Sequence, residues 1–216
     1  MGAKNRVTFL VDGFNVYHSA REARRDLKGT STLWLDFRSL LQSLLSSAIG
    51  RDAILTAIHY FSALATHMDP KRPGTTARHK AYLDCLRATG VQVHLGRFKS
   101  KTVWCRSCKT NNTHYEEKET DVALSAKLLE LFHTDACDSV VLVTGDTDLA
   151  PAVRTAAQVF PTKTVLFAFP YKRKNKELAQ LAGSSFVVRK ERYAAHQLPD
   201  PFVLPSGRAI PKPQNW

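Results

Sequence analysis

The sequence predicts an α/β protein in which helices cover both faces of a mostly parallel β-sheet. Three observations lead to this prediction. Short apolar segments alternate with segments of helical periodicity along most of the 216 residues. Several of the apolar segments are almost continuous, as in strands buried on both faces. The length and the 44% hydrophobic content suit one domain with a substantial core, with or without a short tail.

The predicted strands combine β-branched, aromatic and other apolar residues. The first ends at Asp12-Gly13, a typical strand-to-loop turn. The third alternates like a half-buried strand, whereas the fourth is wholly apolar. The predicted strands are 7–11, 54–61, 91–95, 140–143, 164–169 and 186–188.

The predicted helices fall between these strands. Asp36 is a good N-cap for a helix whose leucines recur at helical spacing, and Gly90 is a typical stop after another helix. The predicted helices begin at Phe37, at Thr75 or Thr76, at Thr120, at Asp148 and at Asn175. Alternating strands and helices are typical of a parallel sheet, in which ligands bind outside the carboxyl ends of the strands.

Two segments interrupt the alternation. Residues 99–118 are polar, contain a Cys-x-x-Cys pair and are predicted to be an insertion within a single domain of residues 1–190. Residues 191–216 are predicted to be a Pro-rich C-terminal tail, extended or disordered, because five of the ten prolines lie from Pro199 onward.

The charge balance predicts a polyanionic partner. The formal net charge is +12 and the pI is about 9.7, which favours nucleic acid or an anionic membrane surface. No apolar run approaches the ~20 residues that span a bilayer, and the polar start is not typical of a signal peptide. We therefore expect a cytoplasmic protein with no membrane association and with reduced cysteines.

Four aspartates occupy comparable places in the alternation. Asp12 follows the first strand, Asp146 and Asp148 follow strand 140–143, and Asp121 lies in the first turn of the preceding helix. If the two strands are neighbours, their carboxyl ends bring Asp12 and Asp146 together. Packed carboxylates share protons or bind a cation, and hard oxygen ligands suit Mg²⁺ or Mn²⁺. Such a metal can activate water against a phosphate.

Each aspartate also has a structural interpretation. Asp12-Gly13 is an ordinary turn, Asp148 can cap its helix, and Asp121 can offset a helix dipole. Only their conjunction at strand ends favours a metal site.

The cysteine pair and the basic clusters are candidates for binding. Cys105 and Cys108 have the spacing of half a zinc knuckle, with a reduced hairpin or a redox-sensitive pair as alternatives. Basic and aromatic residues around them, Lys101 and Arg106 included, suit single-stranded nucleic acid. Lys172, Arg173 and Lys174 follow strand 164–169 and are predicted to contact an RNA backbone at the acidic edge, although a solvated charge run has the same composition.

Three segments resemble the motifs of the NYN domain family, which belongs to the PIN-like nuclease superfamily. The first is Val11-Asp12-Gly13-Phe14-Asn15-Val16, and the second is the Lys-x-x-Asp-Val stretch within residues 117–124. The third is Val143-Thr144-Gly145-Asp146-Thr147-Asp148-Leu149. Order and spacing also match, and the resemblance spans about residues 6–190. Two positions depart from the pattern: Glu119 replaces a small residue and Leu149 replaces an aromatic one.

The resemblance implies a PIN-like three-layer α/β/α fold and a divalent-metal-dependent (endo)ribonuclease, a hydrolase with Mg²⁺ or Mn²⁺ as cofactor and RNA as partner. Asp12, Asp121 and Asp146 would be metal ligands and Asp148 a fourth acid. Asn15 would orient a water or a phosphate, with a helix cap as the alternative.

Three functions therefore stand at this stage. The first is an RNase that cleaves phosphodiesters with metal-activated water, and the second is a non-catalytic RNA-binding or scaffold module on the same fold. A phosphatase or receiver domain is third. A haloacid-dehalogenase phosphatase would need an acid where Phe14 stands, and a receiver would not explain the charge of +12. The cysteine pair could bind Zn²⁺ if His114 or a second subunit of a homo-oligomer completed the site.

Overall fold

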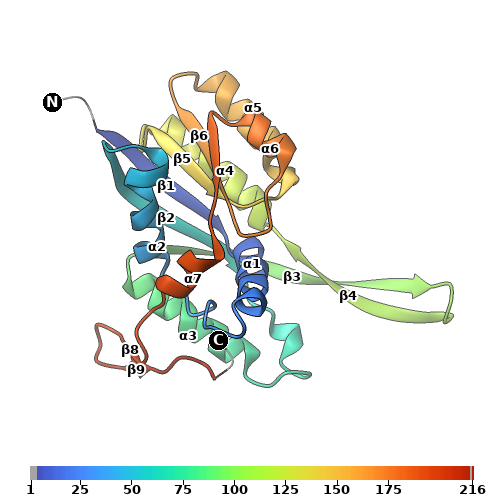
Figure 1. Cartoon of the computed structure of the whole chain (residues 1–216). Coiled ribbons are helices and arrows are strands. Elements are labelled where there is room, and N and C mark those ends of the chain that lie inside the picture. Colours follow the sequence, from blue (N-terminus) through green and yellow to red (C-terminus); the bar gives the residue numbers. More distant parts are fainter. Residues whose placement is uncertain (1–3, 215) are drawn as a thin grey trace.

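The computed structural model describes residues 4–214 and 216 of the chain. Within them, seven strands form one sheet in the order β4-β3-β2-β1-β5-β6-β7 (Figure 1). All neighbours in this sheet are parallel except β3 and β4. The strands are β1 (Asn5–Asp12), β2 (Ala53–Ala63), β3 (Gln92–Cys105), β4 (Thr110–Lys118), β5 (Ser139–Val143), β6 (Thr164–Phe169) and β7 (Ser184–Val187). The predicted mostly parallel sheet is therefore confirmed.

Helices cover the two faces of the sheet and create two hydrophobic cores. Along β1, Val7, Phe9 and Val11 pack into one core, and Leu10 packs into the other, as the alternation of a strand requires. The first core includes α1 (Gly13–Asp26), α2 (Phe37–Leu44), α3 (Thr75–Ala88) and α7 (Lys190–Ala195). The second includes α4 (Thr120–His133), α5 (Ala150–Val159) and α6 (Lys176–Leu181). This is the expected three-layer arrangement.

Helix α1 has no counterpart among the predicted helices. Its buried face consists mainly of small residues, including Ser19, Ala20 and Ala23, so it carries no run of large apolar side chains. Asp12 caps the helix, because its carboxylate accepts a hydrogen bond from the backbone N–H of Asn15 at 2.9 Å. The helix thus begins directly at the end of β1.

The predicted insertion at 99–118 belongs to a long antiparallel hairpin. The first residues of β3 pair with β2, from Gln92 to Gly96, and the strand then pairs with β4 from Arg97 to Cys105. Most of this outer part is exposed, and it projects away from the two helical layers (Figure 1).

The C-terminal segment, which was expected to be extended or disordered, packs on the first core. Leu198 and Ile210 are buried, and the indole N–H of Trp34 donates to the carbonyl of Pro199 at 3.1 Å. The ring of Trp216 contacts those of Trp34 and Tyr82. Two short strands, β8 (Phe202–Val203) and β9 (Ala209–Ile210), pair with each other. The segment is largely extended, but its apolar residues between the prolines cover the core.

Three short helices connect these elements: η1 (Leu45–Ile49), η2 (Thr66–Met68) and η3 (Thr147–Leu149). No helix within residues 4–214 and 216 has both the length and the apolar character that a membrane crossing requires.

A pair of histidines, one buried and one half-buried, links β2 and β3. Nδ1 of His59 lies 2.9 Å from Nε2 of His94, and His59 is 4% exposed. Burial lowers the pKa of His59 to about 4, and His94, Lys127 and Glu130 lie near enough to influence it. Burial also lowers the pKa of His94. The folded state therefore favours two neutral imidazoles. It is fully stable only at a pH at which the imidazoles of the unfolded chain are neutral too.

We predict that this pair lowers stability in mild acid. The unfolded imidazoles titrate near 6.5, so the unfolded chain binds protons first as pH falls from about 6.5 towards 4 and the unfolding free energy drops. In His59→Gln the slope of the unfolding free energy against pH should decrease by up to about 1.4 kcal/mol per pH unit, the contribution of one proton taken up on unfolding. Urea unfolding from pH 7.5 to 5 measures it. The exposed His133→Gln is the matched control, and equal slopes in the two variants would contradict the prediction.

Candidate metal centre

The carboxyl ends of β1 and β5 bring the first two candidate aspartates together. The strands are parallel neighbours, with Val11 beside Val143, and β1 is the point from which the chain builds the sheet in two directions. Crevices at such a point are the usual ligand sites of open α/β sheets. Asp121 reaches the same edge from α4. One oxygen from each of Asp12, Asp121 and Asp146 lies within 4.8 Å of the other two.

Asp12 forms the buried floor of this cluster. Its side chain is almost wholly enclosed, the residue being 6% exposed, and its second oxygen accepts a hydrogen bond from the hydroxyl of Thr144 at 2.8 Å. Burial raises the pKa of Asp12 to about 6, and the nearby carboxylates of Asp121 and Asp146 contribute to the rise. A buried carboxylate beside others is stabilised either by a proton or by a cation.

Asn15 joins the start of α1 to the loop after β5. Besides donating its backbone N–H to Asp12, it accepts a hydrogen bond at its side-chain oxygen from the N–H of Gly145 at 3.2 Å. It therefore does not cap α1, since Asp12 does so. Asn15 therefore ties the start of α1, next to Asp12, to the loop that carries Asp146, and its expected contact with a water or a phosphate stays a prediction.

Asp146 and Asp148 occupy different positions in the third motif. Asp146 caps η3, accepting a hydrogen bond from the N–H of Asp148 at 3.1 Å, and its own N–H donates to the hydroxyl oxygen of Thr144 at 3.1 Å. Asp148 is exposed and lies outside the group of three converging oxygens. Its charge nevertheless contributes, after burial and Asp146, to a raised pKa at Asp121. Asp148 is therefore a fourth acid at the rim.

Glu117 is a further acid at this site that the sequence analysis did not single out. It lies on β4, accepts a hydrogen bond from the hydroxyl of Thr120, and is partly buried. Burial raises its pKa to about 7, with contributions from Asp12 and Asp121. The sequence shows that Glu117 lies four residues before Asp121. Only the pairing of β3 with β4, however, places it next to the cluster of aspartates.

The turn between β4 and α4 determines where Asp121 lies. A Cβ on Gly96 would lie 2.6 Å from the carbonyl oxygen of Lys118, so only glycine allows β3 to pack this closely on the turn. Glu119 follows with φ of 80°, in the left-handed region. This conformation costs a non-glycine residue about 1–2 kcal/mol. Glu119 also pairs with Arg97 at 2.7 Å.

The donor set fits a hard divalent cation. Within the residues that the structure describes, Asp12, Asp121 and Asp146 are the group of three or more potential ligands close enough to share an ion. All three donors are carboxylates, and their burial ranges from enclosed to exposed, which leaves room for water. Oxygen ligands with retained water suit Mg²⁺ or Mn²⁺.

The cysteine pair lies far along the hairpin, at its turn. Cys105 is partly buried and Cys108 is exposed. Hydrogen bonds from Thr110, Cys105 and Asn112 lower the pKa of Cys108 to about 7. No third residue of the described chain, His114 included, joins them in a metal-binding group. A zinc site would thus need ligands from a second copy, and zinc binding stays a prediction.

The basic candidates lie in two places. The segment after β6 lies at the acidic edge, since a Cβ on Gly145 would meet the carbonyl oxygen of Arg173 at 2.1 Å. There Lys172 pairs with Asp26 at 2.6 Å and Arg173 with Glu22 at 2.9 Å, while Lys174 is exposed. Lys101 and Arg106 are exposed on the hairpin, where Lys101 pairs with Glu116 at 3.6 Å. Three of the five predicted RNA contacts are thus engaged by acids, two of them by acids of α1, and the role of all five stays a prediction.

Fold and site together define a parallel α/β protein with a carboxylate cluster suited to a divalent metal. The NYN domain model matches residues 6–188, and the chain belongs to this family of the PIN-like nuclease superfamily.

Two further comparisons found similar proteins, one by sequence and one by structure. A Pseudomonas putida protein named 6-hydroxy-3-succinoylpyridine 3-monooxygenase HspA is 26% identical over 246 residues, which covers 98% of this chain and 75% of that protein. The crystal structure of VPA0982, a protein of unknown function from Vibrio parahaemolyticus, superposes with a TM-score of 0.58. It is 20% identical, with coverage of 88% of this chain and 96% of that one, and supports the fold alone.

Gly145 offers a test of how the third motif is held. In Gly145→Ala the added methyl group would collide with the backbone of Arg173. We expect the unfolding free energy to fall by about 1–3 kcal/mol, and the affinity for Mn²⁺ to fall as Asp146 shifts. Urea unfolding and calorimetric titration measure the two effects. In the control Gly183→Ala the new Cβ has ordinary contacts, none closer than 3.5 Å. Equal behaviour of the two variants would mean that the loop is not closely packed.

Proposed function

We propose that the protein is a divalent-metal-dependent ribonuclease that hydrolyses RNA phosphodiester bonds. The observation that supports this most is the convergence of three carboxylates at the switch point of the sheet. Membership of a nuclease superfamily and a net charge of +12 agree with a polyanionic substrate.

The chain's own residues would divide the work as follows. Asp12, Asp121 and Asp146 would hold the cation, and Asp148 would add negative charge at the rim. Thr144 and the backbone N–H of Asn15 each bond one oxygen of Asp12, which fixes the orientation of the buried ligand. A bound Mg²⁺ or Mn²⁺ would polarise the scissile phosphate and lower the pKa of water.

Two other functions can be weighed against the composition of the site. The name of the Pseudomonas relative describes an oxygenase, and non-haem iron oxygenases commonly use two histidines and one carboxylate. The candidate group here contains three carboxylates and no histidine, which favours phosphate chemistry. A non-catalytic RNA-binding or scaffold module is the alternative on the same fold, and it would not need the carboxylates to be intact.

Asp146→Asn tests the catalytic proposal. Replacing this carboxylate by an amide removes one charged ligand and should reduce RNA cleavage by about two orders of magnitude or more, since metal catalysis contributes several kcal/mol. Unfolding by urea should be little changed. Cleavage of labelled single-stranded RNA is followed with Mn²⁺, with Mg²⁺ and with EDTA.

Asp52→Asn is the control for this variant, because Asp52 is exposed and lies beside the first residue of β2, at the opposite end of the strand from the cluster. Wild-type protein that binds RNA but cleaves none with either metal would favour the scaffold alternative. Cleavage by Asp146→Asn at the wild-type rate would refute the ligand assignment.

A further inference from the structure

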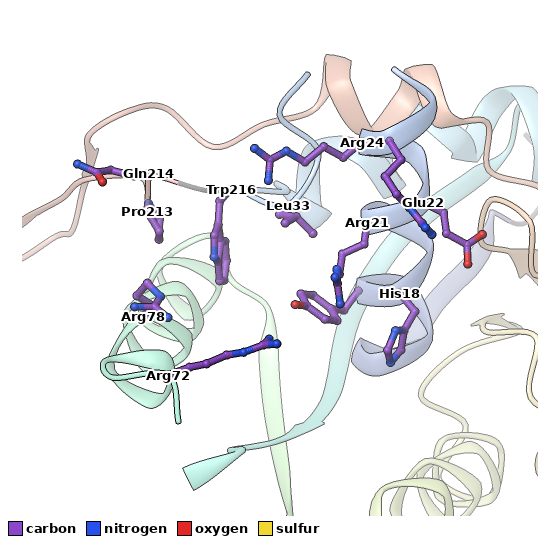
Figure 2. Close-up of a pocket in the computed structure, with 12 residues that line it drawn as sticks. His18, Arg21, Glu22, Arg24, Leu33, Arg72, Arg78, Pro213, Gln214 and Trp216 are labelled. Atoms are coloured by element: carbon purple, nitrogen blue, oxygen red, sulfur yellow. The ribbon is translucent and has the colours of Figure 1, made fainter. Parts of the chain in front are cut away.

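A hollow of about 770 Å³ with a basic lining lies between α1, the segment from η2 to α3, and the C-terminal residues (Figure 2). Five arginines line it, together with Tyr17, His18, Leu33 and Trp216; the arginines are Arg21, Arg24, Arg25, Arg72 and Arg78. Figure 2 shows Arg21 reaching in from α1 and Arg72 from the opposite wall.

The positive charge of this hollow is largely uncompensated. Glu22, the acid of the lining, already pairs with Arg173. Among the described residues, Arg21, Arg25 and Arg72 take part in no ion pair, and Arg78 donates to the carbonyl of Pro73 and the hydroxyl of Thr75. Guanidinium groups converging on one space recognise phosphate through paired N–H donors. A ligand with more than one phosphate is the best match.

An apolar hollow of about 440 Å³ continues from the basic one. The two share Tyr17, Leu33 and Trp216 as well as Arg21 and Arg72. Trp216 is fixed by Trp34 and Tyr82, with ring centroids 6.0 and 5.2 Å away, whereas Tyr17 is 41% exposed. Aromatic faces beside arginines are what unpaired bases and their phosphates require.

Helix α1 connects this composite hollow to the metal centre. Gly13 and Phe14 line the apolar part, and they directly follow Asp12. Tyr17 and Arg21 come next on the same face, at spacings of four residues. Arg21 therefore lies about 12 Å along the helix from Gly13. A nucleic-acid chain bound along this face of α1 would reach the metal centre at the N-terminal end of the helix.

We infer that this hollow binds the nucleotides of single-stranded RNA that flank the bond cut at the metal centre, with a base in the apolar part and phosphates on Arg21 and Arg72. The inference rests on the proposed ribonuclease function. A single strand is required because bases in a duplex are stacked and paired and cannot enter a side pocket. The site is distinct from the segment of Lys172 to Lys174, whose first two cations are paired with acids.

The test is RNA binding in EDTA, which excludes cleavage. Fluorescence anisotropy of a labelled single-stranded RNA is measured over a range of salt concentrations for the wild type and for Arg21→Gln/Arg72→Gln. Lys4→Gln/Arg51→Gln is the matched control, because it removes the same charge from exposed positions within two residues of the starts of β1 and β2.

The arginine variant should bind RNA at least about tenfold more weakly, as expected for lost charge-assisted hydrogen bonds. Its salt slope should fall by about 1.4, or 0.7 for each lost phosphate contact. The control should change neither value by more than a minor amount. Tyr17→Leu should weaken binding without altering the slope, because it removes stacking and no charge.

Cleavage assays separate this inference from the proposed function. If the wild type cleaves RNA, Arg21→Gln/Arg72→Gln should raise KM and leave kcat nearly unchanged. Equal KM and salt slope in the arginine variant and the control would overturn the site, even if cleavage were established. A wild type that cleaves nothing but loses RNA affinity on the arginine substitutions would retain the site and refute the nuclease.

Discussion

The structure depends on one buried carboxylate. Asp12 ends the central strand, caps α1 and contacts the loop after β5, so three elements meet at its two oxygens. Burying an unpaired charge is costly unless hydrogen bonds or a cation compensate. The hydroxyl of Thr144 and the N–H of Asn15 compensate in part, and the raised pKa of Asp12 shows that the remainder favours a proton or a cation. The suitability of this edge for a divalent cation thus follows from the packing that holds the sheet together.

Much of this arrangement could be predicted from the sequence, because the relevant signals are local. The apolar strands identified the sheet, but their order was left open, and strands 7–11 and 140–143 were neighbours only as a condition that the structure now meets. Asp12 and Asp146 could be placed together because parallel strands end at one edge. Helix α1 could not be predicted, because its buried face consists mainly of small residues such as serine and alanine and has no stripe of large apolar side chains. Its best signal was the cap Asp12, which suggested an ordinary turn equally well.

What escaped prediction depends on contacts between distant parts of the chain. Glu117 reaches the acids only through the register of β3 with β4, which no local pattern reveals. The basic hollow combines arginines from residues 21–25 and 72–78 with the C-terminal Trp216. The prolines of the C-terminal segment suggested a tail separate from the domain, yet the apolar residues between these prolines pack on the first core. The sequence likewise does not reveal that Lys172 pairs with Asp26 and Arg173 with Glu22, and the RNA contact expected of this segment stays a prediction.

Helix α1 has the aspartate cluster at its N-terminal end and the arginines of the basic hollow only a few turns further along. Its N-terminus carries the positive end of the helix dipole and faces Asp12, while Arg24 and Arg25 occupy its last turn, near the negative end. Both charge groups are therefore favoured where they stand. A polyanionic chain lying along this helix would be attracted by the arginines and repelled by the carboxylates until a cation neutralises them. Binding and cleavage should thus separate: the basic hollow would hold RNA without metal, and the acidic edge would admit the scissile phosphate only with it.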